Sequence, residues 1–371
     1  MKRKITELNG GSAIVGDLPS GCQFCAKGSK MVLFVTGQCD SSCYYCPLSG
    51  EKAGKDVIFA NETPITENGG VIEEADAIGA EGAGLSGGDP LCTLERTLHF
   101  IEQLKEKYGS NFHLHLYTSK TDATLEDLKK LKNAGLDEIR FHPQIGDWSG
   151  IEHAIKIGME VGIEVPVIPG QVEKLIDLTQ KAENIGVNFV NLNELEASET
   201  NFDQLVSMGF RLTSLEKASI EGSAETANEV LKWAASTLQR ITVHFCSARY
   251  KDAVQLRNRL ERRLERVIRP FEIRDDEDPL LILGVIRAPT GKLLNTENLT
   301  TIYEHLTNEY DVPHDLLNFD SFRNRIEIAP WIIEEISNDL KNDFAGVFEL
   351  EIGIVYEYPT WDRLQTLFEP L

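Results

Sequence analysis

Three cysteines lie close together in the segment CDSSCYYC, at Cys39, Cys43 and Cys46. The CxxxCxxC spacing places three thiolates on one short loop. Soft sulfur ligands favour iron–sulfur clusters, and three of them would hold three irons of a four-iron cube while the fourth iron stays open to another ligand. The alternative is a zinc site, which needs a fourth ligand that the loop lacks and that Cys22 or Cys25 could provide.

The segment Gly87-Gly88-Asp89-Pro90 is a second motif, directly after the second predicted strand. A pair of glycines lets the backbone approach a ligand closely, because no side chain stands in the way. Taken alone, these four residues could form a simple turn. Their position one strand after the cysteine loop favours a role beside it.

The two motifs resemble those of the radical SAM superfamily. There CxxxCxxC follows the first barrel strand, and an aromatic residue, here Tyr45, precedes the last cysteine. GGDP resembles the superfamily's GGEP, whose backbone receives the amino group of a bound methionine, although Asp89 has a shorter reach than the usual Glu. The resemblance implies a [4Fe-4S] cluster on Cys39, Cys43 and Cys46. That cluster would bind S-adenosylmethionine (SAM) and cleave it to a 5'-deoxyadenosyl radical, which abstracts hydrogen from a substrate.

Residues at the ends of later predicted strands are expected around the cofactor. Ser119, His142 and Ile168 stand at or beside the ends of the third, fourth and fifth strands, and the carboxyl end of a parallel barrel carries the active site. The VIPG segment containing Ile168 resembles the fifth strand of pyruvate formate-lyase activating enzymes, where it borders the adenosine. A purely structural role is the alternative for His142. Tyr45 and the GGDP residues complete the expected cofactor contacts.

A second metal site is also conceivable. Cys22 and Cys25 precede the first barrel strand in a CxxC pair, and His244 and Cys246 end a later one. Together they could hold a second iron–sulfur cluster. The alternative is that Cys246 is a buried core thiol, as free cysteines often are.

Charged residues late in the chain provide two further candidates. Glu194 and Glu196 follow the sixth strand, where alternation directs both carboxylates to one side; they could serve a substrate, or they could be solvated loop acids. The arginine-rich segment from Arg249 to Arg274 could grip phosphate, as an RNA-modifying enzyme requires. Its apolar stripe favours instead a docking helix with an arginine-rich solvent face.

Short apolar strands alternate with helical patterns from Met31 to about Ser198, which indicates repeated βα units around a parallel sheet. The fold class expected is α/β, a partial (β/α)6 TIM-like barrel with a C-terminal α+β domain. The predicted strands are Met31 to Thr36, Gly84 to Ser86, Phe112 to Thr118, Glu138 to His142, Glu164 to Ile168 and Phe189 to Asn193, and the predicted helices are Leu94 to Tyr108, Asp122 to Ala134, Ile151 to Val161 and Val172 to Ile185.

Four segments are expected along the chain. Residues 1–30 form an N-terminal segment with a Cys pair, residues 31–215 the barrel core, residues 216–274 a helical extension with the basic helix, and residues 275–371 the C-terminal α+β domain. The acidic run at 275–278 is the linker candidate. The later elements expected are strands at Ile241 to Cys246, Pro279 to Ala288 and Val347 to Tyr358, and helices at Glu297 to Asn308 and Trp331 to Asn342.

The whole chain limits the classes of partner. Its 371 residues carry a formal net charge of -22, which repels phosphate and makes a nucleic-acid partner unlikely. No apolar run has the length of a signal peptide or a membrane helix, so the prediction is a cytoplasmic protein with no membrane partner. Seven cysteines is an odd number, which in a reducing compartment favours metal binding over disulfides.

Within the superfamily the chain is most similar to uncharacterised archaeal-type proteins related to pyruvate formate-lyase activating enzyme. The resemblance covers about Met31 to Ser198, and those activators end soon after the barrel, so the extra domain points to a different substrate. The expected function is hydrogen abstraction from an unknown protein side chain or small metabolite, with ferredoxin or flavodoxin as electron donor. The alternatives are RNA modification and a non-catalytic iron–sulfur or zinc scaffold.

Overall fold

The computed structural model describes residues 2–66, 69–144, 146–347 and 349–371, which divide into two compact units, Met1–Arg259 and Leu260–Leu371. The first unit holds an eleven-stranded sheet. Its strands are β1 (Ile5–Glu7), β2 (Ala13–Val15), β3 (Lys30–Phe34), β4 (Phe59–Ala60), β5 (Thr63–Pro64), β6 (Gly82–Ser86), β7 (His113–Thr118), β8 (Glu138–Phe141), β9 (Glu160–Val167), β10 (Phe189–Glu194) and β11 (Thr242–Cys246). Its helices are η1 (Asn9–Gly11), α1 (Ser20–Ala26), α2 (Gly70–Ile78), η2 (Pro90–Thr93), α3 (Leu94–Tyr108), α4 (Leu125–Ala134), α5 (Ser149–Lys156), α6 (Val172–Ile185), α7 (Phe202–Ser207), α8 (Ser223–Thr237), α9 (Ala248–Tyr250) and η3 (Lys251–Leu256), and α10 (Arg257–Val267) crosses into the second unit.

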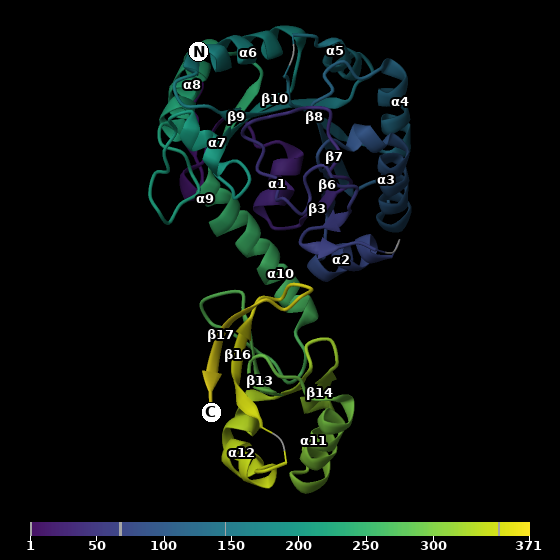
Figure 1. The fold of residues 1–371 in the computed structure, drawn as a ribbon. Coiled ribbons are helices and arrows are strands. Elements are labelled where there is room, and N and C mark those ends of the chain that lie inside the picture. The colour runs from purple at the N-terminus through teal and green to yellow at the C-terminus, as the bar shows by residue number, and fades with distance from the viewer. Residues whose placement is uncertain (1, 67–68, 145, 348) are drawn as a thin grey trace. The chain divides into compact units, whose positions relative to one another are not determined.

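The middle of this sheet is parallel, in the order β11-β10-β9-β8-β7-β6-β3. The sheet curves, and helices α3 to α6 and α8 cover its outer face (Figure 1). The partial TIM-like barrel is thus confirmed, with all six predicted strands in place. The parallel strands continue beyond residue 215, because β11 pairs with β10 and places Cys246 opposite Asn193.

Local signals account for most helix boundaries. Helices α3 and α6 have the predicted bounds, and α4 begins after Thr124, whose hydroxyl accepts a hydrogen bond from the Asp127 backbone. The prediction of a helix to Val161 was wrong at its C-terminal end. Helix α5 stops at Lys156 because Gly158 turns the chain with a φ of 72°, and β9 then begins at Glu160.

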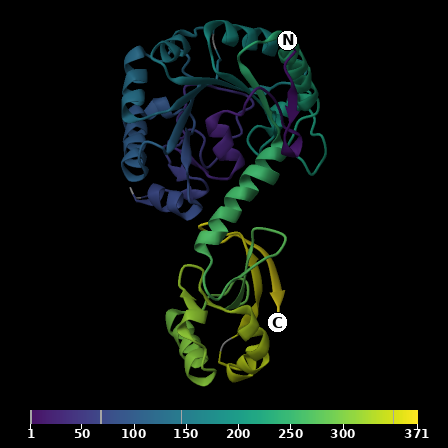
Figure 2. The same ribbon diagram turned by 180° about the vertical axis from the view of Figure 1, so that it is seen from behind.

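Helix α1 lies within the curve of the sheet rather than outside it, as both Figure 1 and Figure 2 show. It packs against β3, β6 and β7. Gly21 makes this approach possible, since a Cβ atom there would lie 2.6 Å from the Arg140 guanidinium and 2.8 Å from His115 Nδ1. The helix therefore brings Cys22 and Cys25 into the barrel interior.

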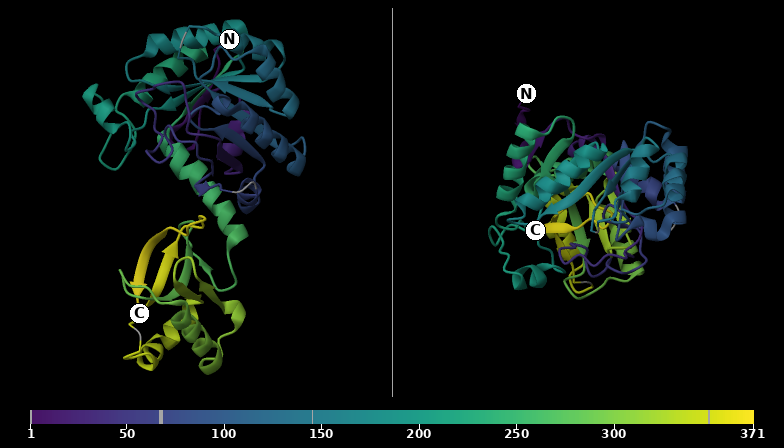
Figure 3. Two further views of the ribbon diagram at one scale, coloured as in Figure 1. Left: turned by 45° about the vertical axis from the view of Figure 1, so that its right-hand side comes forward. Right: turned by 90° about the horizontal axis from the view of Figure 1, so that it is seen from above.

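The second unit combines an antiparallel sheet with the helices α11 and α12, as Figure 3 shows, and this confirms the α+β prediction for the C-terminal part. Apolar side chains of both helices share one core with the sheet, among them Ile302, Ile333 and Ile354. Residue 348, within the predicted strand Val347 to Tyr358, lies outside the described residues. The elements are β12 (Ile273–Arg274), β13 (Leu281–Arg287), α11 (Thr296–Glu309), η4 (His314–Leu316), β14 (Leu317–Asp320), β15 (Arg325–Ile328), α12 (Pro330–Asp343), β16 (Glu351–Glu357) and β17 (Gln365–Pro370).

No helix among the described residues of either unit is both long enough and apolar enough to span a membrane.

Candidate functional site

The loop after β3 carries the three cysteines of CxxxCxxC. Cys39, Cys43 and Cys46 line one cavity of about 230 Å³, here called the cysteine cavity. Cys39 is exposed and the other two thiols are half-buried. The loop is tied to its surroundings at both ends, because Gly37 exchanges backbone hydrogen bonds with the 54–55 turn and the amide of Asn201 donates to the Tyr45 carbonyl at 3.0 Å.

Gly87 and Gly88 form another wall of the cysteine cavity, at the end of β6. A Cβ atom on Gly87 would collide with the Thr36 carbonyl, and one on Gly88 with the Gln38 carbonyl. The backbone amide of Gly88 donates to Thr36 at 2.8 Å, and that of Asp89 donates to Gln38 at 2.7 Å. Only glycines allow this close contact between the GGDP turn and the start of the cysteine loop.

The Asp89 carboxylate is fully buried and does not face the cysteine cavity. It accepts hydrogen bonds from the Leu91 backbone at 3.0 Å, from the Thr118 hydroxyl at 2.9 Å, and from both the backbone and hydroxyl of Ser119 at 2.8 Å. Ser119 in turn accepts from the Ser41 hydroxyl at 3.0 Å. Asp89 therefore holds the ends of β6 and β7 together beneath the cysteine loop, and the next residue, Pro90, is also buried.

Tyr45 and His142 form a polar chain at the edge of the cavity. His142 Nδ1 donates to the Glu164 carbonyl at 2.7 Å, so Nε2 of the neutral ring accepts from the Tyr45 hydroxyl at 2.9 Å. Gln144 donates to the same hydroxyl at 2.8 Å. Burial lowers the pKa of His142, which keeps the ring neutral, and burial raises the pKa of Cys43.

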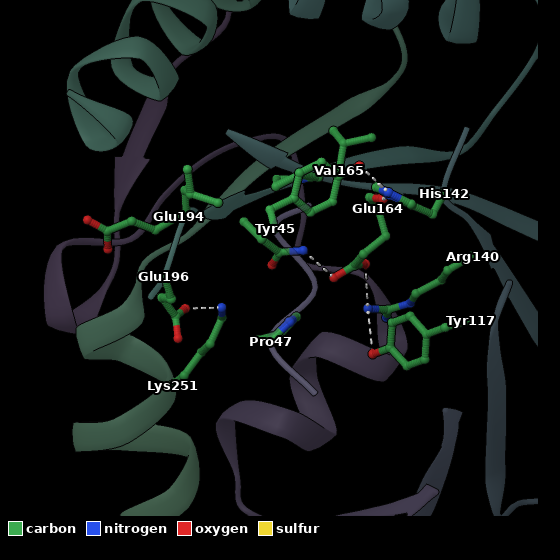
Figure 4. Close-up of a pocket in the computed structure, with 13 residues that line it drawn as sticks. Tyr45, Pro47, Tyr117, Arg140, His142, Glu164, Val165, Glu194, Glu196 and Lys251 are labelled. Atoms are coloured by element: carbon green, nitrogen blue, oxygen red, sulfur yellow. Dashed lines mark hydrogen bonds and ion pairs between the residues drawn. The ribbon is translucent and has the colours of Figure 1, made fainter. Parts of the chain in front are cut away.

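A second cavity, of about 380 Å³ and here called the central cavity, shares Tyr45, Pro47, Tyr117 and His142 with the first. On one side Arg140 donates to the Glu164 carboxylate at 3.2 Å (Figure 4). The two cavities together run from the cysteine loop into the barrel.

The central cavity includes charged residues that sequence reasoning missed. Arg140 is 2% exposed, and Glu164 accepts a further hydrogen bond from Asn193 at 2.9 Å. The available signal was a charged residue inside a predicted strand, since a parallel strand buried on both faces is ordinarily apolar. On the opposite side lie Glu194 and Glu196, two candidates that the sequence did suggest: Glu196 pairs with Lys251 (Figure 4), and burial raises the pKa of Glu194.

Ile168 lies apart from both cavities. It is buried in a small apolar cluster with Leu195, Leu205 and Ile220, against which Tyr45 packs. A contact between Ile168 and a cofactor stays a prediction, and its observed effect is to support the tyrosine beside the cysteine loop.

The basic segment Arg249 to Arg274 is engaged within the protein at several points. Arg259 pairs with Glu62 in the first unit, and Arg274 pairs with Glu261 at 2.5 Å in the second. These ion pairs neutralise part of the positive charge that an RNA-binding face would need.

Comparison with known proteins places the chain in a family. The model of the radical SAM superfamily matches residues 33–158, and a domain of unknown function (DUF8061) matches residues 280–371. A Methanocaldococcus jannaschii protein with the name "Putative glycyl-radical enzyme activating enzyme" is 37% identical over 367 residues, which cover 95% of this chain and 93% of the relative.

Solved structures of radical SAM proteins are more distant. The methyltransferase TsrM of Kitasatospora setae, with tryptophan and a SAM analogue bound, is 12% identical with a TM-score of 0.36 and covers 51% of this chain, which spans 40% of TsrM. Coproporphyrinogen III oxidase (HemN) of Escherichia coli is 12% identical with a TM-score of 0.36, over 59% of this chain and 56% of HemN. The cysteine motif, the barrel and the match along nearly the whole archaeal relative show that the chain belongs to the radical SAM superfamily of enzymes, which use a [4Fe-4S] cluster and SAM.

Proposed function

We propose that Cys39, Cys43 and Cys46 hold the [4Fe-4S] cluster and that SAM binds beside it, along the cysteine cavity and the central cavity. The observation that supports this most is the convergence of the three thiols and the Gly87-Gly88 backbone on one cavity. With cluster and SAM bound, one electron yields methionine and a 5'-deoxyadenosyl radical. Ferredoxin or flavodoxin is the proposed electron donor.

The residues of the chain would position the cofactor rather than react with it. Gly87 and Gly88 line the cysteine cavity with backbone atoms alone, so an amino group of SAM would meet no side chain of theirs there. Tyr45 and His142 form a fixed wall, since each polar atom of the pair is committed to a partner. The Arg140–Glu164 pair places a buried cation and a carboxylate deeper in the barrel, within the central cavity.

We further propose that the hydrogen atom comes from a glycine residue of a partner protein. The support is the name of the archaeal relative, which covers this chain including its C-terminal unit. The extra domain on which we based the expectation of a different substrate is therefore shared with a protein of that name. A small metabolite is the competing substrate class, and the charged central cavity is the feature that would favour it.

The cofactor assignment predicts the largest loss of activity. Cys39→Ala, Cys43→Ala and Cys46→Ala should each abolish release of 5'-deoxyadenosine from SAM under anaerobic reducing conditions, because a cluster with two protein thiolates is not retained. Cys92→Ala is the matched control, since Cys92 lines neither cavity. Full 5'-deoxyadenosine release by a variant with all three substitutions would overturn the assignment.

The substrate proposal needs its own measurement. Extract of cells grown on glycine deuterated at the α-carbon is separated by ultrafiltration into protein and small molecules, and each fraction is incubated with enzyme, SAM and reductant. Deuterium in 5'-deoxyadenosine from the protein fraction supports the glycine proposal. Deuterium transfer only from the small-molecule fraction would contradict it.

A further inference from the structure

A third cavity, of about 180 Å³ and here called the inner cavity, lies between helix α1, strand β11 and the helical segment η3. Three thiols line it, those of Cys22, Cys25 and Cys246, together with the imidazole of His244. None of the three cysteines belongs to the CxxxCxxC loop, and none lines the cysteine cavity. The inner cavity is therefore lined by a second, separate group of side chains of metal-binding types inside the barrel.

His244 presents an unused nitrogen in this cavity. The residue is 1% exposed, and its Nδ1 donates to Asn191 Oδ1 at 3.1 Å. The orientation of the Asn191 amide is fixed, because its nitrogen donates to Glu164 at 2.8 Å and to the Cys22 sulfur at 3.4 Å. His244 Nε2 is consequently the bare nitrogen, and it has no hydrogen-bond partner among the described residues.

This pattern is the one found at histidine metal ligands. A ligating histidine ordinarily donates its other ring N–H to an oxygen, which fixes the tautomer and directs the free lone pair at the metal. A buried nitrogen without any partner is otherwise costly and rare in folded proteins. The Asn191–His244 pair thus holds Nε2 ready for a ligand that the cavity would contain.

The charge of the inner cavity also favours an anionic occupant. Lys30 lines it and bonds only weakly, with its ammonium 3.2 Å from the Tyr117 hydroxyl. No carboxylate among the described residues lies within ion-pair distance of that ammonium. Thiolates bound to a metal centre would supply the missing negative charge.

The distances between the donor atoms of the inner cavity favour an iron–sulfur cluster over a single metal ion. Within the described ranges, the set of three histidine, cysteine or carboxylate groups whose donor atoms all lie within 4.8 Å of one another is His113, Glu138 and Glu160, and no three cysteines form such a set. Zinc holds sulfur at about 2.3 Å, so its ligands must converge on one point. An iron–sulfur cluster distributes its ligands over several irons and accepts a wider arrangement.

The Gln255 side chain contacts thiols of both helix α1 and strand β11. Cys25 donates to Gln255 Oε1 at 2.9 Å, and Gln255 Nε2 donates to Cys246 at 3.6 Å. A single side chain therefore bridges the two sulfurs. Gln255 belongs to the π-helical turn η3, a form often found at functional sites.

We propose that Cys22, Cys25, Cys246 and His244 bind a second iron–sulfur cluster in the inner cavity. Three sulfur donors and one imidazole complete its ligand set, so this cluster has no open iron and differs from the one that binds SAM. The inner cavity shares Tyr117, Arg140, Glu164, Asn193 and Lys251 with the central cavity. The second cluster consequently stands next to the proposed substrate space, and its presence does not depend on which substrate is used.

The decisive experiment uses the full chain with Cys39→Ala, Cys43→Ala and Cys46→Ala combined, reconstituted anaerobically with iron and sulfide. The proposal predicts that this variant keeps two or four irons and as many sulfides per chain, with visible sulfur-to-iron absorbance. Adding Cys22→Ala, Cys25→Ala and Cys246→Ala should remove them. Absence of bound iron from the first variant, or binding of zinc in preference to iron, would overturn the proposal.

His244→Cys is the second variant, because it keeps a ligand where His244→Ala could disturb the fold. In the background without the CxxxCxxC thiols, pulsed electron paramagnetic resonance of the reduced cluster should show coupling to an imidazole nitrogen. His244→Cys should retain the iron content and lose that coupling. Unchanged nitrogen coupling would show that His244 is not a ligand. Because the SAM-binding thiols are absent throughout, failure of the proposed function leaves this result unaffected.

Discussion

The two units bury charged side chains in different ways. In the C-terminal unit Arg325 pairs with Glu327 and Glu357, while Arg269 pairs with Glu327 and Glu272. The side chains of all three glutamates are 0% exposed, and each faces at least one guanidinium. Each buried glutamate of this network therefore has a counter-ion within the unit.

The described part of the barrel interior, in contrast, contains a cation and histidine nitrogens that have no such partner. Lys30 has no carboxylate partner there, and the buried histidine nitrogens without a hydrogen bond, among the described residues, all belong to the barrel unit. Buried polar groups are ordinarily satisfied, and an unpaired one costs stability. The contrast agrees with the two roles proposed, in which the C-terminal network supports the fold and the inner cavity binds the second cluster.

The strongest test of this contrast removes one cation from the complete network. Arg325→Met should lower the free energy of unfolding by about 3–5 kcal/mol, because Glu357 is then buried without the guanidinium that it faces and Glu327 keeps only Arg269. Chemical denaturation followed by circular dichroism measures this. Arg274→Met is the matched control: its ion pair with Glu261 is half exposed, so the expected loss is below about 1 kcal/mol. Equal losses in the two variants would contradict the contrast.

The amphipathic elements that build the two units were predictable from sequence. The bounds of α3 and α6 agree to the residue, because one apolar face and a glycine after the last turn mark each helix. The seven-residue helix α1 was not foreseen. Its position inside the barrel depends on contacts of Gly21 with Arg140 and His115, which are distant in sequence.

In the candidate site too, contiguous motifs were predictable and contacts between residues distant in sequence were not. The CxxxCxxC and GGDP motifs were found because their residues are contiguous, and the structure brings both to one cavity. Arg140 and Glu164 were missed, since only the register of β8 and β9 turns them toward each other. The direction of Asp89 was also unpredictable: its carboxylate faces Thr118 and Ser119 rather than the cavity.

The pH dependence of stability should differ between the units. Contact with Arg325 and Arg269 outweighs burial and lowers the pKa of Glu327 from 4.5 to about 2, so its stabilisation exists above pH 4.5 and is lost as the pH falls toward 2. Over this whole pH range the loss in the free energy of unfolding is about 3 kcal/mol. In the barrel, burial and then Arg140 lower the pKa of His115 well below 6.5. Its stabilisation is therefore present above pH 6.5 and is lost as the pH falls below that value.

The tryptophans allow the two units to be followed separately in the full chain. Trp331→Phe with Trp361→Phe leaves Trp148 and Trp233 as reporters of the barrel, and the reverse pair of substitutions leaves reporters of the C-terminal unit. Between pH 6.5 and 4.5 the denaturation midpoint should fall for the barrel alone. His115→Gln should reduce that fall. A C-terminal unit that weakens first would reverse the expected order.

The smallest effect is expected for Lys30→Met in the metal-free protein. This change also removes a cation from the interior, but no carboxylate loses its counter-ion, so the free energy of unfolding should fall by no more than about 1 kcal/mol, the net contribution of the hydrogen bond to Tyr117. After reconstitution the same variant should retain less iron in the inner cavity than the wild-type chain, because the ammonium no longer balances the thiolates. A loss as large as that of Arg325→Met would mean that Lys30 already has its partner within the fold, and the barrel interior would then resemble the C-terminal network.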